Sequence, residues 1–240
     1  MSGPGPRPDR QDVPHPHASF PDPSGKWLIV PDLGADLTRI FKIDQDTGML
    51  TSCANIASLP GDGPRHGAFK VTAAGLKYYS LNEVSSSVGV YDVVYPADGA
   101  GCLSLKKGQT ISTYGTNVAL GNITVKSAEV RIFGDFLYAS NRNDTTFGKE
   151  KDSIALYKIQ PDGNLAFQSL ENSFGYYPRP FQINAAGTYV AVGGQTTASV
   201  SILGRDPKTG KLGPLVANIV LPPIGTYGGE DGLSSVIWYE

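Results

Sequence analysis

The chain has 240 residues, of which 40% are hydrophobic and 18% charged, and its formal net charge is −2 at pH 7. This composition supplies enough apolar residues for a packed core and excludes a chain that is disordered by composition. It offers no basic surplus for nucleic acid or an acidic membrane surface, and no apolar run approaches the ~18–20 residues of a membrane-spanning helix.

The first residues give an expectation about the compartment. The stretch "SGPGPRPDRQ" after Met1 lacks the apolar segment of a signal peptide, which predicts a cytoplasmic location. An extracellular location stays open if a longer parent chain carries a signal peptide, and the glycosylation triplets at Asn122 and Asn143 are compatible with it. Cys53 and Cys102 are too few for a disulfide scaffold, so we predict that both are unpaired and packed.

Four stretches along the chain share one layout, in which a short apolar segment, a tight turn and an apolar strand follow one another. They are "HASFPDPSGKWLIVPD", "HGAFKVTAAGLKYYSLNE", "EVRIFGDFLYASNR" and "PFQINAAGTYVAVGGQ". Each is followed by a third strand, a glycine turn and a fourth strand, and the turn glycines are Gly48, Gly101, Gly163 and Gly210. Glycine suits such turns because it adopts positive φ without steric cost.

Four short strands per unit of roughly 50 residues are typical of a β-propeller blade. A β-sandwich is the alternative, but it would not need the same turn chemistry at a fixed long period. We therefore predict an all-β fold, a β-propeller of four-stranded blades. The expected organisation is an N-terminal loop over 1–13 and one partial propeller domain over 14–240, with blades at about 14–62, 63–124, 125–177 and 178–222 and a C-terminal closing strand at 231–240.

Polar side chains recur at one position of this repeat. His17 and His66 each lie three residues before the phenylalanine that opens their repeat, and Glu129 and Pro180 hold the same position in the third and fourth repeats. Arg65 and Arg179 recur in the matching loops "GPRH" and "YPRP", while Glu83 and Arg142 close second strands. Such groups could simply cap strand ends. Converging at a channel mouth, they would instead suit an anionic substrate that needs a proton moved.

Several motifs together resemble the lactonase seven-bladed β-propeller family, which includes bacterial-type 6-phosphogluconolactonase and the fungal 3-carboxy-cis,cis-muconate lactonizing enzyme. These motifs are "GPGPRPDRQDVPHPH", "VPDLGAD", "GPRHGAF", "LNE", "LYASNR", "YPRPFQI" and "RDPKTGKL". The resemblance covers nearly the whole chain, in the family's order. It implies that the chain corresponds to the C-terminal four blades and closing strand of a longer protein, as a fragment, a truncated gene product or a shortened paralogue.

The resemblance to the fungal enzyme also implies a catalytic set of His17, Arg65, Glu83 and Arg142. The arginines would hold substrate carboxylates and stabilise enolate-like charge. His17 or Glu83 would carry the proton, and the sequence does not separate them. The remaining candidates, for substrate binding or loop bracing, are His66, Glu129 and Arg179.

The function expected first is lactone formation of the carboxymuconate cyclase type, in which a carboxylate adds across a conjugated double bond. Lactone hydrolysis of the 6-phosphogluconolactonase type is one alternative, and a non-catalytic truncated propeller or binding scaffold is the other. We expect a small substrate that carries a carboxylate or phosphate, and no metal, cofactor, nucleic acid or membrane partner. Unpaired blade edges would permit self-association.

Overall fold

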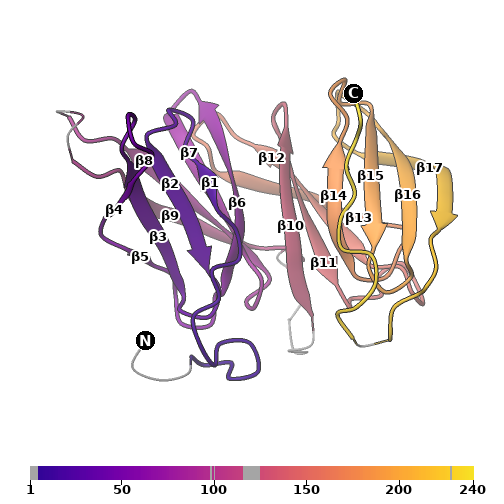
Figure 1. The fold of residues 1–240 in the computed structure, drawn as a ribbon. Coiled ribbons are helices and arrows are strands. Elements are labelled where there is room, and N and C mark those ends of the chain that lie inside the picture. The colour runs from indigo at the N-terminus through magenta and orange to yellow at the C-terminus, as the bar shows by residue number, and fades with distance from the viewer. Residues whose placement is uncertain (1–4, 98, 100, 116–124, 228) are drawn as a thin grey trace. The chain divides into compact units, whose positions relative to one another are not determined.

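The computed structural model describes residues 5–97, 99, 101–115, 125–227 and 229–240 (Figure 1). Within these residues the chain is all-β, with seventeen strands in four sheets, so the predicted fold class is confirmed. No helix long and apolar enough to cross a membrane occurs in this part of the chain. The chain divides into two compact units, Met1–Ser112 with Gln160–Leu165, and Thr113–Ile159 with Ala166–Glu240.

The first unit contains two sheets, whose strands follow one another in chain order. The first sheet is formed by β1 (Phe20–Pro21), β2 (Trp27–Asp32), β3 (Leu37–Ile43), β4 (Leu50–Ser52) and β5 (Ile56–Ala57). The second sheet is formed by β6 (Pro64–Thr72), β7 (Gly75–Asn82), β8 (Ser87–Val94) and β9 (Ser104–Ser112). Both β4 and β5 pair with β3, so the expected fourth strand of the first repeat is split into two short pieces. Residues 116–124, the end of the predicted second blade and the site of the Asn122 triplet, lie outside the described residues.

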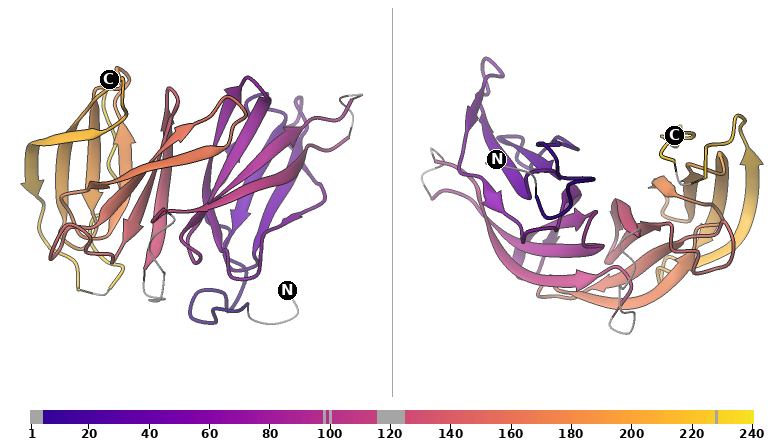
Figure 2. Two further views of the ribbon diagram at one scale, coloured as in Figure 1. Left: turned by 180° about the vertical axis from the view of Figure 1, so that it is seen from behind. Right: turned by 90° about the horizontal axis from the view of Figure 1, so that it is seen from below.

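The second unit carries the other two sheets. The third sheet is formed by β10 (Lys126–Phe133), β11 (Phe136–Arg142), β12 (Ser153–Ile159) and β13 (Leu165–Asn172). The fourth sheet is formed by β14 (Pro178–Ile183), β15 (Tyr189–Gly194), β16 (Ser199–Arg205) and β17 (Leu212–Val220). Figure 2 shows this last sheet from behind, with β17 at its edge. Hairpin connections explain the order, because antiparallel neighbours can be joined by short turns.

Each unit has its own hydrophobic core between its two sheets. In the first unit, Trp27, Ile29 and Ile40 pack with Tyr78 and Tyr91. In the second unit the buried cluster runs from β11 and β12 to β14, β15 and β16, and comprises Phe136, Tyr138, Ile154, Leu156, Phe181, Val190, Val192 and Leu203. The middle strands β7, β8, β11, β12 and β15 are buried along most of their length, whereas β2, β3 and β16 alternate between buried and partly exposed residues.

The glycine turns between third and fourth strands pack onto the preceding sheet. Tyr79 donates a hydrogen bond to the Gly163 carbonyl at 2.8 Å, and Tyr138 donates one to the Gly210 carbonyl at 2.6 Å. Gly210 has φ of +74°, and a Cβ there would lie 2.5 Å from the Phe136 ring. Glycine is therefore needed at this turn both for its backbone angle and for the close approach.

The prediction that both cysteines are unpaired is wrong. Cys53 and Cys102 form a disulfide, with their Cα atoms 5.8 Å apart. Cys53 lies between β4 and β5, and Cys102 lies just before β9, so the bond joins the two sheets of the first unit. The sequence could not show this pairing because the cysteines are 49 residues apart and only the packing of the sheets brings them together.

Residues 231–240 form no strand, which departs from the expected closing strand. The tail instead runs along β14 through side-chain contacts (Figure 1). The Trp238 backbone N–H donates to Gln182 Oε1 at 2.7 Å, and the Trp238 indole donates to the Gln182 carbonyl at 2.9 Å. A strand requires a repeating backbone ladder, and a glutamine side chain that accepts the backbone N–H interrupts it.

The edge strand β17 is apolar and exposed. Leu215, Val216, Ile219 and Val220 have exposed fractions between 40% and 57%. An exposed apolar edge strand is a template for pairing with another chain. Self-association through blade edges is compatible with this strand and stays a prediction.

Candidate functional site

The predicted polar positions lie at irregularities of the first strand in three of the sheets. The pairing register shifts near the start of β6, β10 and β14. The residues inside these shifts are Arg65, Ala128–Glu129 and Arg179–Pro180. A bulge turns side chains away from the regular alternation of a strand and is common beside active sites. The polar positions that recur in the sequence therefore coincide with a backbone bulge that recurs in β6, β10 and β14.

In the first unit, the Glu83 carboxylate is held between two arginines. Glu83 is fully buried and its Oε2 accepts a hydrogen bond from Arg65 Nε at 2.8 Å. Its Oε1 accepts from Arg10, at 2.9 Å from Nε and 2.6 Å from Nη2. Arg65 is itself 1% exposed. Both carboxylate oxygens thus serve charge-assisted hydrogen bonds, which suits a positioning role for Glu83 better than proton transfer.

The two candidate histidines lie against each other beside this ion pair. The rings of His17 and His66 are 5.2 Å apart between centroids, in an edge-to-face arrangement. Arg65 Nη1 lies 3.2 Å from His66 Nε2. Because a guanidinium only donates, Nε2 of His66 must accept, which places the proton of the neutral ring on Nδ1. His17 and His66 are both half-buried. His17 thus lies in direct ring contact with His66, and its Nδ1 atom is buried.

The neighbouring His15 has a different setting. It is exposed, and its Nε2 lies 2.8 Å from Asp12 Oδ1 at the surface. Its backbone N–H donates to Asp32 Oδ1 at 2.8 Å. His15 therefore holds the N-terminal loop to the end of β2, whereas His17 contacts His66.

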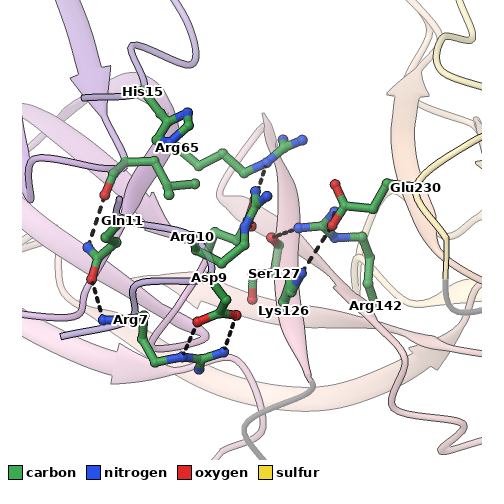
Figure 3. A network of polar contacts seen from close by, with 12 residues as sticks. Arg7, Asp9, Arg10, Gln11, His15, Arg65, Lys126, Ser127, Arg142 and Glu230 are labelled. Atoms are coloured by element: carbon green, nitrogen blue, oxygen red, sulfur yellow. Dashed lines mark hydrogen bonds and ion pairs between the residues drawn. The ribbon is translucent and has the colours of Figure 1, made fainter. Parts of the chain in front are cut away.

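In the second unit, Arg142 occupies the end of β11 and is 1% exposed. Its Nη2 donates to the Ser127 carbonyl at 3.2 Å, and its Nη1 lies 3.8 Å from Glu230 Oε1 (Figure 3). Its guanidinium stands 5.8 Å from the Tyr177 ring centroid. Arg142 and the group of His17, Arg65 and Glu83 lie in different units. Their convergence on one substrate therefore stays a prediction.

The remaining candidates also lie in the second unit. Glu129 is 5% exposed, and its Oε1 accepts from the backbone N–H of Val130 at 2.9 Å and lies 3.3 Å from Arg131 Nη1. Arg179 is half-buried in the β14 bulge. The contacts of Glu129 brace the start of β10, and a role of Glu129 or Arg179 in substrate binding stays a prediction.

A buried carboxylate organises the loop that follows Arg142. Asp152 is fully buried, and its two oxygens accept four backbone N–H groups at 2.8–2.9 Å, from Asn143, Asp144, Thr145 and Tyr177. Burial raises the pKa of Asp152 to about 6, opposed by these N–H groups and reinforced by the nearby Asp144 carboxylate. The loop geometry around Arg142 therefore depends on one titratable side chain.

The described part of the chain contains no cluster of three or more His, Cys, Asp or Glu side chains that could hold a metal ion. Three residues in these polar networks were missed by sequence reasoning, namely Arg10, Lys126 and Glu230. Arg10 lies in the N-terminal loop, where the basic residues of "RPDR" were the only signal. Lys126 and Glu230 are 104 residues apart, and no local pattern relates them.

Comparison with known proteins identifies the family. The model of the family described as "Lactonase, 7-bladed beta-propeller" matches residues 1–226. The chain belongs to the lactonase seven-bladed β-propeller family. The family resemblance inferred from the motifs is thereby confirmed.

Individual members of the lactonase family agree with this assignment. The chain is 35% identical over 218 residues to a protein of Arthroderma benhamiae named "Probable 6-phosphogluconolactonase", covering 89% of this chain and 53% of that protein. It is 32% identical over 218 residues to the 6-phosphogluconolactonase of Formosa agariphila, covering 88% and 56%. The chain thus spans about half the length of these relatives.

The fold is also shared with solved structures. The periplasmic gluconolactonase of Pseudomonas aeruginosa superposes with a TM-score of 0.72 at 26% identity, covering 90% of this chain and 57% of that one. These names favour the hydrolytic alternative, and they give no support to the expected muconate cyclase function.

Proposed function

We propose that this protein, or the longer protein to which its sequence corresponds, hydrolyses a sugar lactone, with 6-phosphogluconolactone as the substrate. The names of its relatives support the reaction class. The observation that carries the proposal is the pair of His17 and His66 beside Arg65, because lactone hydrolysis needs a base for water and a cation for the oxyanion.

The proposed reaction follows from this arrangement. His17 takes a proton from a water molecule, whose oxygen attacks the carbonyl carbon of the lactone. The carbonyl oxygen becomes the oxyanion of a tetrahedral intermediate, which the positive charge of Arg65 would stabilise. The ring C–O bond then breaks, and the departing alkoxide takes the proton back from His17. Glu83 and Arg10 would hold Arg65 in place rather than exchange protons.

An unphosphorylated sugar lactone is a second candidate substrate. The disulfide between Cys53 and Cys102 favours it, because disulfides persist in oxidising compartments and are rare in the cytosol. The structural similarity to a periplasmic gluconolactonase points the same way. The disulfide also favours an extracellular location over the cytoplasmic one expected from the N-terminal sequence.

The proposal is tested by measuring proton release from 6-phosphogluconolactone and from gluconolactone, each corrected for spontaneous hydrolysis. We expect His17→Ala to lower kcat by about 10²–10³-fold. His15→Ala, which removes a surface imidazole two residues away, should leave kcat unchanged.

Absorbance of 3-carboxy-cis,cis-muconate is followed in parallel. Turnover of this compound would favour the cyclase reaction and overturn the proposal. A folded protein that turns over none of the three compounds would favour the non-catalytic alternative.

A further inference from the structure

The two cations Lys126 and Arg142 face each other across one strand pair of the second unit. Lys126 begins β10, Arg142 ends β11, and the two are direct partners in the pairing register. Side chains directly opposite in an antiparallel pair lie on the same face of the sheet, and like charges there repel. Lys126 has an 18% exposed side chain and that of Arg142 is 1% exposed, so water only partly screens the repulsion. Such a pair is stabilised by an anion placed between its charges.

In the structure that anion is the carboxylate of Glu230. Its Oε1 lies 3.0 Å from Lys126 Nζ and 3.8 Å from Arg142 Nη1 (Figure 3). The Glu230 side chain is 40% exposed, in contrast to the buried guanidinium that it covers. The Glu230 carboxylate thus contacts two cations on one side and is exposed to solvent on the other.

The backbone that carries Glu230 is anchored independently of this carboxylate. The Gln195 side chain donates to the Glu230 carbonyl, and the Leu233 N–H donates to the Gln195 carbonyl at 3.1 Å. Thr226 donates to both carboxylate oxygens of Asp231, at 2.8 Å and 2.9 Å. The segment therefore has contacts that hold its place other than those of the Glu230 carboxylate.

We propose that Lys126 and Arg142 form a phosphate-binding subsite, and that Glu230 occupies it as an internal carboxylate that the ligand displaces. A phosphate dianion would neutralise both cations, whereas one carboxylate carries a single charge. Arg142 would meet the phosphate through Nη1, the nitrogen nearest Glu230, because its Nη2 donates to the Ser127 carbonyl. The Lys126 ammonium would act as a point charge beside it. The subsite lies within the second unit and rests on the proposed function for its ligand class, a sugar lactone that carries a phosphate.

The test measures binding of inorganic phosphate by calorimetry, which requires no turnover. We expect Glu230→Gln to bind phosphate about tenfold more tightly than the wild type, because the competing charge is removed and the side-chain shape is kept. Lys126→Met should bind it at least tenfold more weakly. Matched controls are Glu150→Gln and Lys151→Met, which change the same charges at exposed positions of the same unit and should leave the affinity unchanged.

A second readout is thermal stability. Phosphate should raise the Tm of Glu230→Gln more than that of the wild type, because in this variant only the ligand relieves the Lys126–Arg142 repulsion. Unchanged or weaker phosphate affinity in Glu230→Gln, or unchanged affinity in Lys126→Met, would overturn the subsite.

Two further ligands separate a substrate phosphate from free phosphate. Lys126→Met should weaken binding of 6-phosphogluconate and leave that of gluconate unchanged. Equal weakening of both ligands would overturn the assignment to phosphate. A protein that binds phosphate as expected but hydrolyses no lactone would overturn the proposed function and leave the subsite standing.

Discussion

The buried Glu83 carboxylate accepts charge-assisted hydrogen bonds from Arg65 and Arg10. Arg65 in turn contacts His66, and His66 packs against His17. The orientation of both imidazoles is thereby linked, through Arg65, to the Glu83 carboxylate, which directly follows strand β7. A residue with this position can affect activity without contacting substrate.

We expect Glu83→Gln to lower the free energy of unfolding by about 3 kcal/mol, because it leaves the buried Arg65 charge without its carboxylate. The measurement is urea denaturation at pH 7. Asp9→Asn, which breaks the exposed Arg7–Asp9 pair, serves as the contrast and should cost less than about 1 kcal/mol. Equal effects of the two substitutions would show that burial does not decide the strength of the Glu83 pair.

At the scale of elements, the connections after strands determine how the site is presented. The loop between β11 and β12 follows Arg142 directly, and Asp152 accepts hydrogen bonds from three backbone N–H groups of this loop. The same carboxylate reaches Tyr177, whose ring lies beside Arg142. Titration of Asp152 should therefore change both the stability of this loop and the position of Arg142.

The raised pKa of Asp152, about 6 in place of 3.8, gives a pH prediction with a definite sign. The folded state favours the protonated form, so the stabilising contribution is fully present below about pH 3.8 and is lost as the pH rises through about 6. Asp152→Asn, which does not titrate, should therefore be more costly at pH 4 than at pH 7, by about 2 kcal/mol.

Urea denaturation of the wild type and Asp152→Asn at both pH values measures this difference. A substitution that costs more at pH 7 than at pH 4 would show the opposite balance. In that case the four N–H groups would outweigh burial and hold the pKa of Asp152 below its ordinary value.

At the scale of the whole molecule, each unit is built from two packed sheets, and the first unit adds a covalent link. The disulfide between Cys53 and Cys102 connects the sheet of β1–β5 to the sheet of β6–β9. A bond that closes a long loop restricts the unfolded chain most, because it removes more of its conformations. The link therefore stabilises the unit that carries His17, Arg65 and Glu83.

Replacing both cysteines with alanine should lower the free energy of unfolding by about 2–4 kcal/mol. Urea denaturation of the wild type and the double variant measures this loss, with protein produced in an oxidising compartment. Thiol titration of the unfolded, unreduced wild type is the control and should detect no free thiol. Detection of two thiols would contradict the disulfide.

Much of the fold could be predicted because it depends on local patterns. Turn glycines such as Gly163 and Gly210 recur at blade spacing, and the strands between them follow apolar runs, so four groups of four strands were visible in the sequence. The equivalence of Arg65 and Arg179 was also visible, because both occupy the same short motif, which lies at the start of a strand. These features need only residues within one repeat.

The sequence by itself determined the all-β repeat, its turns and the candidate residues His17, Arg65, Glu83 and Arg142. Only the tertiary structure decided what these residues contact. Glu83 pairs with Arg65 and Arg10, and Arg142 lies with Lys126 at the carboxylate of Glu230. It also decided that Cys53 and Cys102 are paired. The physical reason is that these contacts join strands and segments far apart in the chain, whose proximity depends on sheet packing and leaves no trace in local sequence.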